Sequence, residues 1–154
     1  EGYGAGGVAV IVEALTDNRN RTAAEIRHIF DRNGGSLGAT GCVSWMFEKK
    51  GMLVVDRAGC DADALMMAAL EAGAEDVAEN GGVYEITTDP AAFSQAREAL
   101  EKAGYAFLSA EVELLPQNTV RVEAQHEENL HRLLDMLDDN DDVQNVYHNA
   151  QTGA

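Results

Sequence analysis

Two arginines in a polar stretch are the residues of this sequence best suited to binding chemistry. Arg19 and Arg21 fall within seven consecutive polar residues, 16–22, between a strand pattern and a helical pattern. The start of a helix carries a partial positive charge that attracts anions, and arginine makes two-pronged contacts to phosphate that lysine does not make. The stretch is therefore either a contact with nucleic-acid phosphate or a solvated loop whose arginines pair with Asp17 or Glu25.

The net charge of −16 is concentrated in the second part of the chain. Residues 1–50 contain six basic and six acidic residues, whereas residues 51–154 contain five basic and 21 acidic ones. Nucleic-acid affinity comes largely from cations that displace the counterions of phosphate, so an acidic surface opposes it. Any nucleic-acid contact is thus expected within residues 1–50. The candidate contact residues are Asn18, Arg19, Asn20, Arg21, Arg27, Lys49 and Lys50.

The opening glycine block, residues 2–7, matches the dinucleotide-binding pattern GxGxxG. That pattern binds pyrophosphate when a strand precedes it and a helix N-terminus follows it, but here a strand pattern follows. We therefore expect a flexible loop that enters a strand, because glycine accepts positive φ angles. Together with a second glycine pair, this open loop is a candidate contact for a partner. The glycines assigned to such contacts are Gly4, Gly6, Gly7, Gly34 and Gly35.

Neither a metal site nor a catalytic site is recognisable in the sequence. His126 and His131 are five residues apart, which at about 100° per residue places their rings about 140° apart on a helix, so they do not chelate one ion from one face. The acidic run 138–142 lacks the central glycine and final glutamate of a calcium loop. Cys42 and Cys60 show no CxxC spacing and are expected to be reduced thiols. We expect no enzyme, no metal and no cofactor.

Apolar patterns indicate the elements that position these residues. The alternation over residues 106–114 is the clearest half-buried strand, and a capping box at residues 22–25 predicts the start of the first helix. A turn is expected at residues 49–51. Strands are expected over residues 8–12, 43–48, 52–56, 76–79, 83–88, 106–114, 120–124 and 143–148, and helices over residues 22–33, 61–72, 90–103 and around 130–137.

The order of these elements predicts an α+β protein made of two ferredoxin-like βαββαβ domains. Residues 1–49 and 117–154 together supply the elements of one domain. Residues 50–116 supply the full order by themselves, and we expect them to form a second domain inserted into the first. No apolar run approaches the roughly 20 residues needed to cross a bilayer, so no membrane is expected as a partner.

Several long strings resemble the YebC family of regulatory proteins. They are residues 2–10, 13–22, 33–35, 37–38, 41, 47–51 and 142–149, which include the string EALTDNRNRT. Ala5 stands where the family usually has proline, and Cys42 stands where it usually has serine. The family also begins with a basic helical N-terminal domain that this chain lacks. These departures concern loop rigidity, a hydroxyl contact and the supply of cationic surface.

The resemblance implies a cytoplasmic, non-enzymatic regulator of gene expression with no catalytic residues. Members are described as probable DNA-binding transcriptional regulators, whereas others, including the mitochondrial translational activator of cytochrome c oxidase, act with ribosomes. The partner is therefore expected to be DNA or ribosomal RNA, bound mainly with the help of the N-terminal domain. Arg27 and Arg32 are five residues apart and diverge on their helix, which favours contact with RNA shape or phosphate over reading of bases. A ligand-binding or protein-interaction module is the alternative.

Overall fold

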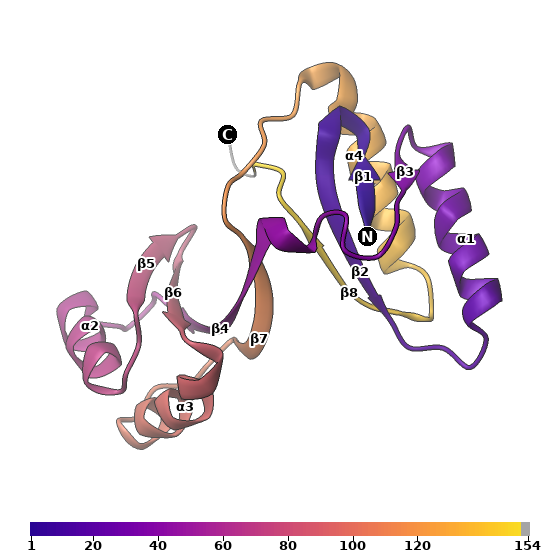
Figure 1. The fold of residues 1–154 in the computed structure, drawn as a ribbon. Helices are drawn as coiled ribbons and strands as arrows, with labels where there is room; N and C mark the ends of the chain where they lie inside the picture. Colours follow the sequence, from indigo (N-terminus) through magenta and orange to yellow (C-terminus); the bar gives the residue numbers. More distant parts are fainter. Residues whose placement is uncertain (152–154) are drawn as a thin grey trace. The chain divides into compact units, whose positions relative to one another are not determined.

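The computed structural model describes residues 1–151, which form two compact units (Figure 1). Unit 1 comprises residues 1–48 together with the chain from Leu115 onward, and unit 2 comprises Lys49–Leu114. The chain passes from unit 1 into unit 2 within one strand and returns within another. No helix in residues 1–151 is long and apolar enough to cross a membrane.

Unit 1 is a four-stranded antiparallel sheet with two helices. Its strands lie in the order β3-β1-β2-β8, and every neighbouring pair is antiparallel. The elements are β1 (Gly2–Gly4), β2 (Val8–Ala14), α1 (Arg19–Arg32), β3 (Ser36–Leu37), α4 (Ala124–Asp138) and β8 (Val143–His148), with single 3-10 turns at Ala5–Gly7 and Ser44–Met46.

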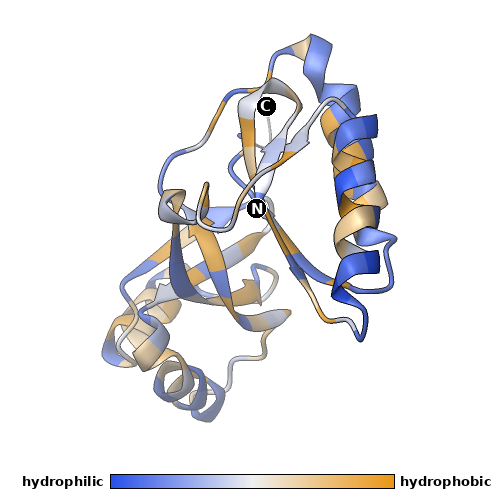
Figure 2. Cartoon of the chain, turned by 45° about the vertical axis from the view of Figure 1, so that its right-hand side comes forward, coloured by the Kyte–Doolittle hydropathy of each residue, from blue (hydrophilic) through white to orange (hydrophobic). Residues whose placement is uncertain are grey.

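The core of unit 1 lies between the central strand β2 and both helices. Val8 and Val10 of β2 pack with Phe30 of α1 and with Leu133 and Leu137 of α4, and all five side chains are fully buried. Each such burial stabilises the fold by about 2 kcal/mol. The opposite faces of α1 and α4 are hydrophilic, as the alternating colours along the helices show (Figure 2).

Unit 2 has the complete ferredoxin-like element order. Its sheet order, β5-β6-β4-β7, places the first strand of the unit between the third and the fourth. The elements are β4 (Phe47–Asp56), α2 (Ala62–Glu71), β5 (Asp76–Asn80), β6 (Val83–Thr88), α3 (Phe93–Lys102) and β7 (Ser109–Pro116), with a 3-10 turn at Pro90–Ala92. Leu53, Leu65, Ile86 and Leu100 are fully buried in its core. The predicted fold class, α+β with two ferredoxin-like sheets, is confirmed.

The predicted turn at residues 49–51 is wrong, because β4 runs without a break from Phe47 to Asp56. Gly51 pairs with Thr88 inside the sheet. A Cβ atom at Gly51 would collide with the Thr88 hydroxyl and with the ring of Phe93. This glycine therefore serves close packing rather than a turn, and the two lysines before it are strand residues.

The predicted strand over residues 120–124 is also wrong. Only Val120 makes a bridge, to Ala150, and α4 begins at Ala124. The predicted strand over residues 43–48 is wrong as well, because Ser44–Met46 form a 3-10 turn and only Phe47 and Glu48 belong to a strand, β4. The sheet of unit 1 contains instead the strands β1 and β3. Both are short and rich in small or polar residues, so neither has the apolar alternation by which strands are recognised.

Candidate nucleic-acid interface

Helix α1 begins earlier than the capping box predicted. The side chain of Asn18 accepts a hydrogen bond from the backbone N–H of Arg21 at 3.1 Å, so Asn18 is the N-cap and Arg19 the first helical residue. The Asn18 N–H in turn donates to the hydroxyl of Thr16 at 3.0 Å. Arg19, Asn20 and Arg21 therefore lie in the first turn of the helix and not in a loop.

Thr22 is 3% exposed and has a different role from the predicted cap. Its hydroxyl oxygen lies 2.8 Å from Asp142 Oδ2 and 2.8 Å from the hydroxyl of Thr16. The Thr22 hydroxyl, together with the Arg21 guanidinium, lowers the pKa of the Asp142 carboxyl below its usual value. This contact joins the start of α1 to the segment before β8, residues that are 120 positions apart in the sequence.

Arg21 is held by three carboxylates. Its guanidinium lies 3.3 Å from Asp142, 3.5 Å from Asp17 and 3.9 Å from Glu25, although its side chain remains 51% exposed. Pairing with Asp17 or Glu25 was one of the two alternatives for this stretch, and Arg21 makes both pairs. Its positive charge is largely balanced within the unit, so it is a weaker candidate for phosphate than the sequence suggested.

Helix α1 has three further arginines, Arg19, Arg27 and Arg32, whose charges are not balanced as that of Arg21 is. All three are exposed, and none has an ion-pair partner among residues 1–151. Arg19 and Arg27 are eight residues apart, which places them about 80° apart around the helix axis and about 12 Å apart along it. Two free guanidinium groups thus share one side of α1, together with the exposed Asn20 near its start.

The two candidate lysines belong to unit 2 and differ from each other. The ammonium of Lys50 lies 2.7 and 3.0 Å from the two carboxylate oxygens of Glu75, and its side chain is only 16% exposed. Lys49 is exposed. Lys50 therefore has its charge balanced by Glu75, and only Lys49 remains as a surface cation of this pair.

The glycines assigned to partner contacts separate into packed and open positions. Gly4 lies in β1 and is buried, and a Cβ there would meet Leu133 at 3.0 Å. A Cβ at Gly35 would lie 2.5 Å from the carbonyl oxygen of Tyr3. These two glycines pack inside unit 1 and are not contact loops, which corrects the prediction for them. Gly6, Gly7 and Gly34 are exposed and have positive φ, as turn glycines do.

An exposed tryptophan is a candidate that the sequence patterns did not single out. Trp45 is 68% exposed, and its ring N–H donates to the carbonyl oxygen of Cys42 at 3.0 Å. The carboxylate of Glu1 accepts hydrogen bonds from the backbone N–H groups of Gly41 at 2.6 Å and Ser44 at 2.7 Å, which fixes the turn that carries Trp45. Exposed aromatic rings stack on nucleic-acid bases. The sequence alone does not show whether a single tryptophan is buried or exposed.

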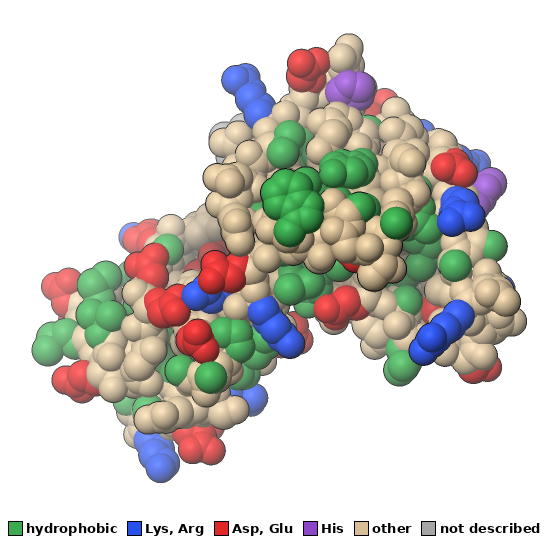
Figure 3. Space-filling view, in the orientation of Figure 1, with side chains coloured by type: hydrophobic (Ala, Val, Ile, Leu, Met, Phe, Trp, Pro, Cys, Tyr) green, Lys and Arg blue, Asp and Glu red, His purple; other side chains and the backbone are tan. Residues whose placement is uncertain are grey.

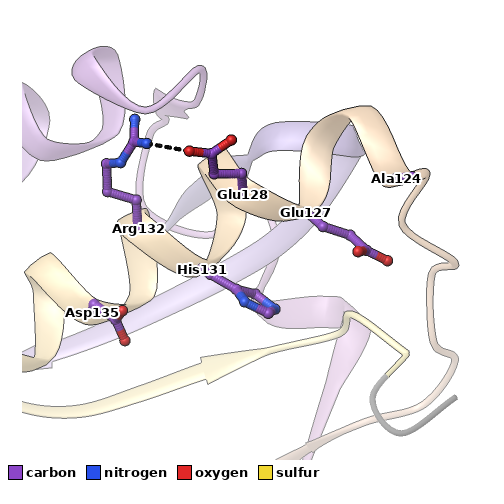
Figure 4. Close-up of a pocket in the computed structure, with 6 residues that line it drawn as sticks. All are labelled: Ala124, Glu127, Glu128, His131, Arg132 and Asp135. Atoms are coloured by element: carbon purple, nitrogen blue, oxygen red, sulfur yellow. Dashed lines mark hydrogen bonds and ion pairs between the residues drawn. The ribbon is translucent and has the colours of Figure 1, made fainter.

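The two histidines of the predicted helix lie on α4, and His131 lines a shallow surface shown in Figure 4. All residues that line it come from α4 alone, so no second element closes over it. Glu128 accepts a hydrogen bond from Arg132 at 2.8 Å along this surface. Residues 1–151 contain no group of three histidine, cysteine or acidic side chains placed to hold a metal ion. Cys42 and Cys60 are both free thiols.

Comparisons with known proteins identify relatives of this chain. The family described as TACO1/YebC second and third domain matches residues 1–150. The chain is 60% identical over 150 residues to a probable transcriptional regulatory protein of Caldicellulosiruptor saccharolyticus, covering 97% of this chain and 62% of the relative. It is 55% identical over 149 residues to a protein of the same description from Syntrophus aciditrophicus, covering 97% of this chain and 60% of the relative.

A solved structure has the same fold. The crystal structure of a conserved hypothetical protein from Aquifex aeolicus superimposes with a TM-score of 0.89 at 42% identity, over 97% of this chain and 62% of that one. This chain thus spans about three fifths of the length of its relatives. The relatives bear the name of regulators rather than of enzymes, in agreement with the prediction of a non-enzymatic regulator. The chain belongs to the YebC family.

Proposed function

We propose that this chain is the part of a cytoplasmic YebC-type regulator of gene expression that contacts nucleic-acid phosphates along α1. The observation that carries the proposal is the pair Arg19 and Arg27, which are exposed on one side of α1 without carboxylate partners within residues 1–151. Guanidinium groups without a carboxylate partner displace the counterions that are condensed on nucleic-acid phosphates. The release of these counterions drives binding. The charge of Arg21 is balanced by Asp142, and its role is to hold the helix start in place.

The target we propose is ribosomal RNA, as expected for a ribosome-associated translation factor. A separation of about 12 Å along the helix axis leaves room for the two arginines to contact separate phosphates of a folded RNA. Trp45 adds a fixed aromatic surface for stacking on an unpaired base, because its ring is held by a hydrogen bond while its face stays exposed. Contacts of this kind read the shape of RNA rather than a base sequence.

A DNA-binding transcriptional regulator is the second candidate, and the names of the relatives favour it. Direct reading of a DNA sequence places a basic helix face in the major groove. On α1, however, Arg27 and Arg32 diverge by about 140°, and the exposed acids Glu25 and Asp31 lie among the arginines. The electrostatics of α1 therefore support contact with phosphate more than recognition of base edges.

The test is co-sedimentation of the chain with ribosomes over a series of salt concentrations, with and without the double change Arg19→Ala/Arg27→Ala. We expect weaker binding and a slope of log affinity against log salt that is smaller by about two, because two phosphate contacts are lost. Both positions are exposed, so the fold should persist. A matched control is Arg97→Ala/Lys102→Ala in unit 2, which removes the same charge and should leave the slope unchanged.

Equal ribosome binding by the α1 double variant and the control variant would contradict the proposal. Gel shifts on a promoter duplex and on a duplex of scrambled sequence address the second candidate. Tighter binding to the promoter than to the scrambled duplex, lost in the α1 double variant, would establish DNA reading instead. Trp45→Ala separates stacking from charge, since it should weaken binding to single-stranded RNA while leaving the salt slope intact.

A further inference from the structure

Helix α2 of unit 2 carries an exposed apolar strip that the fold of the unit does not use. Met66, Met67 and Leu70 are 46%, 65% and 55% exposed. Leu65 and Ala69, on the opposite side of the same helix, are fully buried in the core of unit 2. The helix therefore has apolar residues on both sides, although an ordinary surface helix has only one apolar face.

The three exposed side chains form one continuous patch, which we call the α2 patch. Leu70 follows Met66 by four residues and Met67 by three, so all three are neighbours on the helix surface. Single exposed apolar residues are normal in proteins, whereas large contiguous apolar patches mark interaction sites. Methionine side chains are flexible and polarisable, which suits a surface that receives another protein.

The charges around the α2 patch indicate its occupant. Asp63 precedes Met67 by four residues and Glu71 follows it by four, so acidic groups lie at both ends of this row. Neither has an ion-pair partner among the residues that the structure describes. Figure 3 shows hydrophobic side chains gathered over α2, at the left, with acidic side chains beside them. Residues 58–96 contain no lysine or arginine at all.

Charge excludes two other occupants. A nucleic acid is repelled, since segment 58–96 has eight acidic residues and no basic one, and only Glu75 and Glu79 of these acids form ion pairs within the part of the chain that the structure describes, with Lys50 and Arg57. The acidic residues there are Asp61, Asp63, Glu71, Glu75, Asp76, Glu79, Glu85 and Asp89. A second copy of the chain would bring a like-charged rim against the same rim, because a two-fold interface pairs a patch with itself.

We propose that the α2 patch docks a basic amphipathic helix of a partner protein. The apolar face of that helix covers Met66, Met67 and Leu70, and its lysines and arginines lie against Asp63 and Glu71. Amphipathic helices bind hydrophobic surfaces through anchors at i, i+3, i+4 and i+7, so the apolar stripe of the partner helix can lie along the patch that Met66, Met67 and Leu70 form. This surface is distinct from α1 in unit 1, so the chain has a nucleic-acid contact on one unit and a protein contact on the other.

The test uses a labelled peptide of about 18 residues, long enough to form a helix, with leucines on one face and lysines on the other. Its binding to the whole chain is followed by fluorescence anisotropy. We expect saturable binding that weakens at least about tenfold in Met67→Gln/Leu70→Gln, because central apolar anchors dominate such interfaces. Glutamine is a good helix former, so α2 should persist, which circular dichroism checks.

Matched controls separate the patch from general stickiness. Leu15→Gln/Leu108→Gln removes two apolar side chains that are 75% and 61% exposed elsewhere, and it should leave peptide affinity unchanged. Asp63→Asn/Glu71→Gln should weaken binding and reduce its salt dependence. The variant Glu127→Gln/Asp135→Asn on α4 removes the same charge elsewhere. If it weakens peptide binding equally, the proposed contacts of Asp63 and Glu71 with the peptide are wrong. A peptide of scrambled sequence that binds equally well would overturn the proposal.

Two further measurements distinguish the excluded occupants. The first is sedimentation. If the unmodified chain is a dimer and the variant Met67→Gln/Leu70→Gln is not, the α2 patch binds a second copy of the chain. Binding of single-stranded RNA that was lost in the same variant would assign it to nucleic acid. We expect neither measurement to respond to this variant.

Discussion

The two units differ in how they use their glycines and their carboxylates. In unit 1, a Cβ atom at Gly2 or Gly35 would lie within 2.6 Å of backbone oxygen, whereas Gly73, Gly81 and others in unit 2 have open space around them and occupy turns. Unit 1 thus has several glycines that permit close approach of backbones besides turn glycines such as Gly7, whereas in unit 2 only Gly51 is closely packed and the others permit positive φ. Two sheets of similar size are therefore sensitive to different substitutions.

The carboxylates follow the same division. In unit 1, backbone N–H groups, that of Gly41 foremost, lower the pKa of Glu1, and the Thr22 hydroxyl lowers the pKa of Asp142. In unit 2, burial raises the pKa of Glu113, and the nearby Glu111 and Glu85 raise it further. Glu1 and Asp142 stabilise unit 1 when charged, whereas charging Glu113 opposes folding of unit 2.

The sharpest test of the glycine comparison is Gly35→Ala against Gly81→Ala. We expect Gly35→Ala to destabilise unit 1 by about 2–3 kcal/mol, because the new methyl group would lie 2.5 Å from the carbonyl oxygen of Tyr3. Gly81→Ala in unit 2 should cost about 1 kcal/mol, since only its φ of 57° is unfavourable. Urea unfolding of both variants measures the difference, and equal costs would remove the distinction between the units.

A buried threonine in each unit gives the next largest effect. Thr22→Val removes the hydroxyl that bridges Asp142 and Thr16, and should cost about 1–2 kcal/mol. Thr88→Val in unit 2 removes only a 3.1 Å hydrogen bond to the carbonyl oxygen of Asp89, and should cost about 1 kcal/mol or less. Thermal unfolding compares the two. A larger loss for Thr88→Val would show that the contact to Asp142 contributes little.

Acidification should weaken unit 1 relative to unit 2. The lowered pKa values of Glu1 and Asp142 give stability that is present above their ordinary values of 4.5 and 3.8 and is lost as pH falls through the folded-state pKa. Burial lowers the pKa of His148 below 6.5, so protonation of the unfolded state also favours unfolding of unit 1 below that pH. Glu113 acts with the opposite sign in unit 2.

Methyl signals of isoleucine measure this comparison in one sample. The chain has four isoleucines, of which Ile11, Ile26 and Ile29 belong to unit 1 and Ile86 to unit 2. Urea unfolding is followed at pH 7 and at about pH 4. The urea concentration at the midpoint of unfolding should fall with pH by more for unit 1 than for unit 2. Parallel movement of both midpoints would contradict the proposed division of the carboxylates.

The smallest expected effect is that of Glu113→Gln. Because the folded-state pKa of Glu113 is raised, the charged form costs stability above that pKa, and this cost disappears as pH falls through it toward 4.5. The neutral variant should therefore unfold at a slightly higher temperature at pH 7 and at an unchanged temperature at acidic pH. Glu98→Gln on the exposed side of α3 is the control, and a pH-independent gain in both variants would contradict this account.

Sequence patterns predicted unit 2 better than unit 1. In unit 2 the alternation of Tyr84 and Ile86 with half-buried residues marks β6. Asp61 caps α2, and Asp89 caps the 3-10 turn before α3, close to where both helices were expected to begin. In unit 1, β1 consists of Gly2, Tyr3 and Gly4 and carries no such pattern. Short strands that gain their stability from neighbours on both sides leave little trace in local sequence.

The candidate site shows the same limit. The polar stretch, its arginines and the charge balance of residues 1–50 and 51–154 can be read from residue types alone, because formal charge is a property of composition. The sequence by itself thus determined the family and the fold class, and it predicted in which part of the chain a cation would meet phosphate.

Only the tertiary structure decided which of those cations is free. Asp142 reaches Arg21 and Thr22 from 120 or more positions away, and Glu75 reaches Lys50 from another element. Arg19 and Arg27 remain open because no strand or loop brings a carboxylate to them within residues 1–151. Ion pairing depends on distance in space, since Coulomb attraction falls with separation, and distance in space is what a linear sequence does not contain.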